Sequence, residues 1–126
     1  MINNDATFVK LKEEIDQIFT ELSMNHPRYC SGVSWLKELV LIAVRDPDTW
    51  DDEYLEYIGK RENITRERVR QILHKAAWDN WSRDSKMVLE NHFESPIQIK
   101  FEYDKPNHIE FITLIAKEMR TRRHLC

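Results

Sequence analysis

Residues 58–73, IGKRENITRERVRQIL, combine in one short stretch the features of a helix, a tight turn and a second helix. Gly59 allows two helices to cross closely, and Asn63 stands where the chain must turn, because asparagine tolerates the left-handed conformation better than most residues. Thr65 is a good N-cap for the second helix, and Glu67 lies in its first turn, where a carboxylate complements the helix dipole. This stretch predicts a helix-turn-helix.

The helix that begins after Thr65 is predicted to be amphipathic, and Ile64 is predicted to fill the space between the turn and the core. Apolar residues recur along it at intervals of three and four positions and form one stripe: Val69, Ile72, Leu73 and Ala76. At about 100 degrees per residue, the opposite side carries Glu67, Gln71, His74 and Trp78, flanked by Arg68, Arg70 and Lys75.

Residues 60–75 contain six Lys or Arg and two Glu, a net charge of +4 in a chain whose total is −3. A basic helix in an acidic protein indicates an anionic partner, and arginine and glutamine are the residues that pair most often with guanine and adenine in the major groove. The alternative is a solvated charged face, which is the usual meaning of such a run. The candidate DNA-binding residues are Lys60, Thr65, Arg66, Glu67, Arg68, Arg70, Gln71, His74 and Lys75.

The composition predicts one domain, residues 1–126, with an all-α fold of about six helices. Hydrophobic residues make up 41% of the chain, and there are only two glycines and four prolines. The longest apolar run, ELVLIAV, is far shorter than the roughly 20 residues of a membrane span, and no export signal is present. We therefore expect a soluble cytoplasmic protein. Cys30 and Cys126 are expected to be buried or terminal free thiols, without a disulfide or a metal.

Helical periodicity extends over most of the chain. A first helix is predicted at about 6–23, a buried central helix at 33–44, a short helix from near Asp51, another from near Asp84, and a last helix that ends at about Arg123. Asn107 and Glu110 are predicted to cap that last helix reciprocally. Residues 97–103 alternate in polarity, but a lone strand has no partner for its backbone groups, so an extended linker is favoured over intermolecular strand pairing.

Other groups of polar and aromatic residues receive structural interpretations. An acidic group is interpreted as a capped helix start rather than a metal site: Asp46, Asp48, Asp51, Asp52 and Glu53. The histidines show no ligand spacing and are expected on the surface or in loops, with only His74 functional: His26, His74, His92, His108 and His124. Trp35, Trp50 and Trp81 are assigned to the core. Trp78 packs against the linker and last helix, or marks a partner surface. The last arginines complement the helix dipole or contact phosphate: Arg120, Arg122 and Arg123.

The helix-turn-helix region, residues 58–73, takes part in two resemblances to known families. Residues 58–72 are similar to the promoter-reading helix-turn-helix of bacterial sigma factors, in which a threonine is followed by arginine and glutamate and a glutamine lies one turn further on. A longer part of the chain, residues 15–124, resembles the C-terminal effector domain of the stage zero sporulation protein A family. The segments that carry this resemblance are GVSWLKELV (32–40), TRERVRQILHKAAWDNWSR (65–83) and KPNHIEFITLIAKEMRTRRH (105–124).

The second resemblance implies an all-helical domain, a winged-helix-like or sporulation effector-domain-like bundle, whose helix-turn-helix enters the major groove and binds tandem sites. It implies no catalytic chemistry. Arg68 matches a family arginine that approaches DNA, whereas Arg70-Gln71 and His74-Lys75 replace other residues, so the operator sequence is not implied. Full-length family members also carry a receiver domain, which we do not expect in this chain, so phosphorylation control is not carried over.

Three classes of function can be compared with the sequence. The favoured hypothesis is a sequence-specific transcriptional regulator that binds double-stranded DNA as a monomer and pairs on tandem sites, since no heptad seam is visible. The second is a protein-interaction module that binds RNA polymerase, its sigma subunit or another regulator. An enzyme is disfavoured because the sequence shows no nucleophile–base pair and no phosphate loop, and no cofactor is expected.

Overall fold

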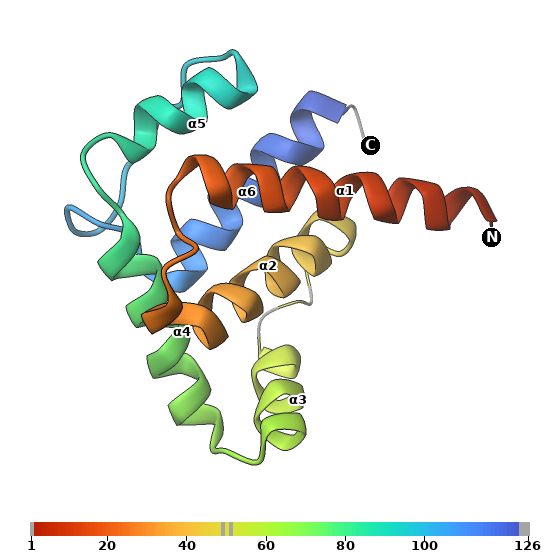
Figure 1. Cartoon of the computed structure of the whole chain (residues 1–126), viewed down its shortest axis with the longest axis vertical. Coiled ribbons are helices and arrows are strands. Elements are labelled where there is room, and N and C mark those ends of the chain that lie inside the picture. Colours follow the sequence, from red (N-terminus) through yellow and green to blue (C-terminus); the bar gives the residue numbers. More distant parts are fainter. Residues whose placement is uncertain (1, 49, 51, 124–126) are drawn as a thin grey trace.

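The chain folds into a bundle of helices with no strand in the part described by the computed structural model, residues 2–48, 50 and 52–123 (Figure 1). This confirms the predicted all-α class. The helices are α1 (Ile2–Glu21), α2 (Cys30–Arg45), α3 (Asp52–Glu62), α4 (Arg66–Asn80), α5 (Ser85–Phe93) and α6 (His108–Arg123), with a short 3₁₀ helix, η1 (Pro27–Tyr29), before α2. Helices α3 and α4 form one end of the molecule, and α5 lies toward the other.

Helix α2 is the centre of the bundle and packs against α1, α4 and α6. Its sequence is apolar on most sides, and Leu36, Leu39 and Val40 are completely buried. A helix that is apolar all round is stable only where other elements cover it on several sides. The prediction of a buried central helix is therefore confirmed.

Aromatic side chains join the outer helices to this centre. The Phe19 and Phe111 rings meet edge to face with centroids 5.7 Å apart, and the Trp81 ring lies 6.3 Å from that of Phe111. These contacts bring α1, α6 and the end of α4 together, in the geometry that aromatic pairs prefer. Trp35, Trp50 and Trp81 are all buried, as predicted.

The helix boundaries differ from the predicted ones by a few residues. Helix α1 begins at Ile2, four residues earlier than predicted, and ends at Glu21. Ser23 then adopts a positive φ of 60°, and the Met24 N–H donates to the Phe19 carbonyl at 3.0 Å, which closes the last turn. Helix α2 begins at Cys30, which is exposed, so the expectation of a buried thiol is wrong for this residue. Cys126 lies outside the described residues.

The segment between α5 and α6 is a linker without a strand, as predicted, but it bends at residues 102–105, and acidic side chains satisfy part of its backbone. The Ile97 N–H donates to Glu90 Oε2 at 2.8 Å, and the Glu102 N–H donates to Glu110 Oε2 at 3.0 Å. Ile97 is buried, so the segment is fixed to the core by side-chain packing and by these carboxylates. It needs no neighbouring strand.

Helix α6 begins with the predicted reciprocal cap. Asn107 Oδ1 accepts the Glu110 N–H at 2.8 Å, and Glu110 Oε1 accepts the Asn107 N–H at 3.0 Å. Two amides at the start of the helix are thereby satisfied. Helix α6 ends at Arg123, as predicted.

The acidic helix start lies only partly within the described residues, because Asp51 is outside them and α3 begins at Asp52. Within the described ranges, no group of three or more His, Cys, Asp or Glu side chains is placed to hold a metal ion. No helix in those ranges is long and apolar enough to cross a bilayer.

Candidate nucleic-acid interface

The turn between α3 and α4 has the geometry that the sequence predicts. Asn63 adopts a left-handed conformation with φ of 60°, and the Ile64 N–H donates to the Gly59 carbonyl at 2.9 Å. A Cβ atom at Gly59 would lie 2.9 Å from the Ile64 carbonyl oxygen, a distance that real Cβ atoms essentially never show. Glycine is therefore needed here for the turn to fold back onto α3. Ile64 is half-buried and packs against the core.

Helix α4 has the predicted N-cap, and its apolar stripe faces the core as predicted. Thr65 Oγ1 accepts the Arg68 N–H at 3.0 Å, and Glu67 lies in the first turn. In the apolar stripe, Val69, Leu73 and Ala76 are buried, and Ile72 is half-buried. The opposite face of α4 must consequently point to solvent.

A close contact with α2 fixes the position of α4. A Cβ atom at Gly32 would lie 2.7 Å from Ala76 Cβ and 2.9 Å from the Ile72 carbonyl oxygen. The two helices can approach this closely only because residue 32 has no side chain. This role of Gly32 was not predicted from the sequence, although a glycine inside an apolar helix is the signal that could have indicated it.

All nine candidate DNA-binding residues are exposed, and they lie on α4 and on the end of α3 that adjoins it: Lys60, Thr65, Arg66, Glu67, Arg68, Arg70, Gln71, His74 and Lys75. At the centre of this surface, Arg68 Nη1 donates to Gln71 Oε1 at 3.4 Å. The two side chains that are best suited to pair with bases thus lie side by side. We call the exposed side of α4 from Arg66 to Asp79 the outward face.

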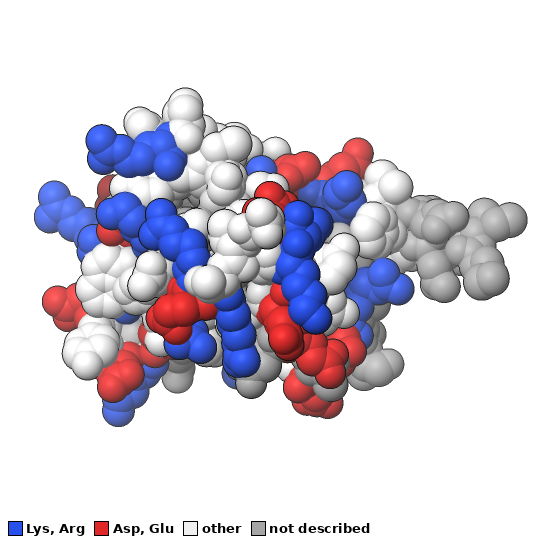
Figure 2. Space-filling view, turned by 90° about the horizontal axis from the view of Figure 1, so that it is seen from below, with Lys and Arg blue, Asp and Glu red and all other residues white. Residues whose placement is uncertain are grey.

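The outward face is mixed in charge rather than uniformly basic. Arg70 Nη1 contacts Glu67 Oε1 at 2.9 Å, and Lys75 Nζ contacts Asp79 Oδ2 at 3.2 Å. Seen from the α3–α4 end, Figure 2 likewise shows Lys and Arg side chains interleaved with carboxylates. Surface ion pairs of this kind are weak, so these cations remain able to exchange partners.

Asp79 is also held from a second element. The Tyr29 hydroxyl donates to Asp79 Oδ2 at 3.0 Å. Burial raises the pKa of the Asp79 carboxyl, but hydrogen bonds from Lys75 and Tyr29 and the charges of Lys75 and Lys105 lower it, and the net shift is downward. Asp79 therefore stays ionised and keeps Lys75 close to the surface of α4.

Arg61 belongs to the basic segment but points to α2 instead of outward. Its Nη1 lies 2.9 and 2.6 Å from the two carboxylate oxygens of Glu38, and its guanidinium lies 5.4 Å from the centroid of the Tyr57 ring. The hydrogen bonds that Arg61 donates to the Glu38 carboxylate raise the pKa of Arg61 above its already high range, against the opposing effect of burial. Arg61 braces α3 against α2, so its charge does not belong to the outward face.

Aromatic rings extend the outward face toward the segment before α6. The centroids of His74 and Trp78 are 5.4 Å apart, and those of Trp78 and Tyr103 are 6.3 Å apart. Trp78 is half-buried. Of the two alternatives for this residue, the structure shows the packing against the linker.

His108 lies in the interior behind α4, so the prediction that it is a surface or loop residue is wrong. It is only 5% exposed, and neither ring nitrogen has a hydrogen-bond partner among the described residues. Burial, followed by the charges of His74 and Arg70, lowers its pKa to about 4. The ring is neutral at physiological pH and adds no charge to the outward face.

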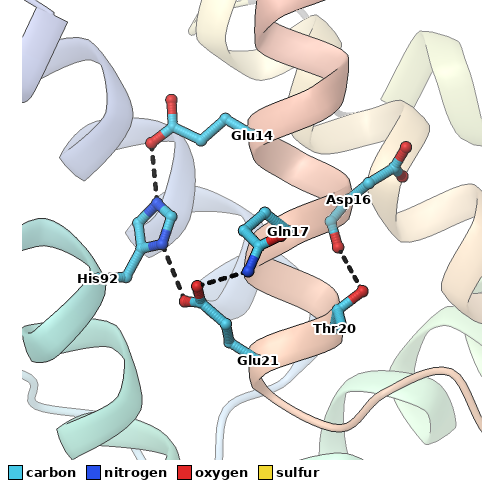
Figure 3. Close-up of polar contacts among 6 residues, drawn as sticks. All are labelled: Glu14, Asp16, Gln17, Thr20, Glu21 and His92. Atoms are coloured by element: carbon cyan, nitrogen blue, oxygen red, sulfur yellow. Dashed lines mark hydrogen bonds and ion pairs between the residues drawn. The ribbon is translucent and has the colours of Figure 1, made fainter.

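His92 was also expected on the surface but fastens two helices at the other end of the bundle (Figure 3). Its Nδ1 lies 2.9 Å from Glu21 Oε1, and its Nε2 lies 2.9 Å from Glu14 Oε2. The ring projects from α5 and both carboxylates from α1. The other expectations for charged residues near the C-terminus are untested, because His124 and the side chains of Arg122 and Arg123 lie outside the description.

Comparison with known proteins adds no assignment to this geometry: no family model, no curated protein sequence and no solved structure matches the chain.

Proposed function

We propose that this chain is a sequence-specific transcriptional regulator that binds double-stranded DNA, with α4 in the major groove. The observation that carries the proposal is the exposed Arg68–Gln71 pair on the N-terminal half of a helix whose opposite side is buried. A recognition helix contacts base edges with its N-terminal residues, and both side chains lie in the first half of α4. The resemblance to the sporulation effector domain agrees with this mode of docking.

Side chains around that pair suit contacts with phosphate. Lys60 and Arg66 lie on either side of the turn, and Lys75 lies one turn beyond Gln71. Phosphate contacts position a protein on DNA, whereas base contacts specify the sequence. In the proposed complex, Arg68 and Gln71 discriminate bases, and the surrounding cations supply the affinity that depends on salt.

A second candidate function is favoured by the mixed charge of the outward face. Glu67 pairs with Arg70 and Asp79 pairs with Lys75, so the outward face presents both signs of charge, which a protein partner with a complementary charge pattern could match. In this alternative the helix-turn-helix binds RNA polymerase, its sigma subunit or another regulator. Retention of purified RNA polymerase on the immobilised chain after nuclease treatment, together with no selected DNA site, would favour it.

Selection of bound duplexes from a random pool tests the proposal and supplies the site. On the selected duplex, Gln71→Ala should cost about 1–3 kcal/mol and relax the preference at one or two base pairs. Gln17→Ala is a matched control, because it removes the same side chain from the exposed side of α1. If the Gln71 variant is folded and keeps the affinity and base preference of the wild type, α4 does not recognise the sequence.

Lys75→Ala provides the complementary measurement. Since Lys75 is a flanking cation, its loss should weaken selected and random duplexes about equally and reduce the slope of log affinity against log salt by roughly one. The contrast with Gln71→Ala separates base contacts from phosphate contacts on one helix. A change of base preference in the Lys75 variant would contradict this division.

A further inference from the structure

Among the side chains that the structure describes, Tyr103 is the most exposed large hydrophobic one, at 67%, and its ring contacts Trp78 of α4. Trp78 in turn contacts His74 on the next turn of α4. The three rings form a continuous line from the outward face to the segment before α6. The exposed end of this line fills no space in the core, so packing does not explain it.

The position of Trp78 along α4 indicates where this line would meet DNA. Trp78 follows Gln71 by seven residues, which is about 10 Å along a helix axis. The major groove is roughly 12 Å wide. If Gln71 contacts base edges at the middle of the groove and the axis of α4 crosses the groove, Trp78 reaches the sugar–phosphate backbone at its edge, and Tyr103 lies beside Trp78.

The charged residues around Tyr103 form no cationic patch. Glu102 and Asp104 flank it in sequence, while Lys105 lies near enough to Asp79 to lower the pKa of that carboxyl. The carboxylates outnumber the lysines, so the surroundings of Tyr103 are slightly acidic, and what this surface can offer DNA is a phenol hydroxyl and ring faces, not a cationic patch. Tyrosine hydroxyls are regular donors to phosphate oxygens, and sugar contacts need no charge.

We propose that Tyr103, supported by Trp78, makes a second contact with DNA, on the backbone that borders the groove occupied by α4. This inference rests on the proposed function. The contact widens the footprint beyond the helix-turn-helix and holds α4 at a fixed angle in the groove. Because it touches no base edge, it adds affinity without sequence preference.

The test compares Tyr103→Ala, Tyr103→Phe and wild type on the selected duplex and on a scrambled duplex of equal length. Tyr103→Ala should weaken binding to both duplexes by roughly two- to tenfold, the range expected for one neutral hydrogen bond. Its salt slope should equal that of the wild type, unlike that of Lys75→Ala. Tyr103→Phe should behave like the alanine variant if the hydroxyl makes the contact. Hydroxyl-radical footprinting should show one backbone segment losing protection.

Met87→Ala is the matched control, because Met87 is 55% exposed on α5 and lies outside the proposed interface. If Tyr103→Ala binds as Met87→Ala does while Gln71→Ala loses base preference, the second contact is refuted and the proposed function stands. If neither Tyr103 nor Gln71 matters, the proposed function itself fails. If Tyr103→Ala binds DNA normally but changes the sedimentation of the chain, the rings face a second copy, and the inference is wrong.

Discussion

At the α1–α5 end of the bundle, the ring of His92 is held between the carboxylates of Glu14 and Glu21, whereas at the α3–α4 end Arg68 and Gln71 contact one another on an open surface. The first arrangement uses polar groups to join helices. The second leaves them accessible, and the position of their helix is set by apolar packing and by the close approach at Gly32. Binding groups that take no part in fastening the fold can be exchanged without unfolding it.

The largest expected effect comes from breaking the close approach at Gly32. In Gly32→Val the new side chain would collide with Ala76 Cβ and the Ile72 carbonyl, which lie 2.7 and 2.9 Å from the first added atom. Overpacking of this kind should reduce the free energy of unfolding by about 3 kcal/mol or more. Urea denaturation measures this loss in the free energy of unfolding. Ser31→Val, on the exposed side of α2, is the control for the effect of valine on helix propensity. Equal midpoints for the two variants would contradict the role of Gly32.

Acidification should have the next largest effect, through His108 behind α4. Its pKa is about 4 in the folded chain and 6.5 as the ordinary value. Between these values the unfolded chain binds a proton that the folded chain does not. Stability should therefore fall as the pH is lowered from 6.5 through 4, by up to about 3 kcal/mol.

Denaturation at several pH values tests this expectation. The variant His108→Leu should show a shallower dependence on pH. It should also be more stable at neutral pH by about 1 kcal/mol, because two buried nitrogens without partners are removed. If the variant and the wild type have the same pH dependence, His108 is not the group responsible.

The smallest expected effect tests whether the α1–α5 end contributes to stability but not to DNA binding. His92→Ala removes both contacts with α1 and should lower the free energy of unfolding by about 1 kcal/mol. Affinity for the selected duplex should not change, since α5 lies away from the proposed interface. Denaturation tests the expected loss of stability, and binding to the selected duplex tests the unchanged affinity. In both measurements His92→Ala is compared with Met87→Ala. A loss of DNA affinity without a loss of stability would show that the two ends are not independent.

Features that depend on neighbouring residues could be predicted from the sequence. The cap at Thr65, the turn at Asn63 and the reciprocal cap of α6 each involve residues at most four or five positions apart, so their chemistry is visible in a short window. The amphipathic stripe of α4 is a local pattern of the same kind. It indicates which side of α4 is buried, and therefore that Gln71 and His74 on the opposite side are exposed.

Features that depend on distant partners could not be predicted. Arg61 contributes to the positive charge of residues 60–75, but Glu38, which binds it, is 23 positions away. The partners of His92 are 71 and 78 positions away, and nothing in the local sequence distinguishes it from a surface histidine. The burial of His108 likewise results from the packing of α6 on α4, not from its neighbours in the chain.

The central position of α2 has a consequence for how the chain folds during its synthesis. Helix α2 packs more extensively against α6 than against any other described helix, and α6 begins more than sixty positions after α2 ends. At roughly 5–20 residues per second on the ribosome, several seconds pass between the two helices. During that interval the apolar surface of α2 that α6 later covers remains exposed to other nascent chains and to chaperones, and the core closes only after α6 has emerged.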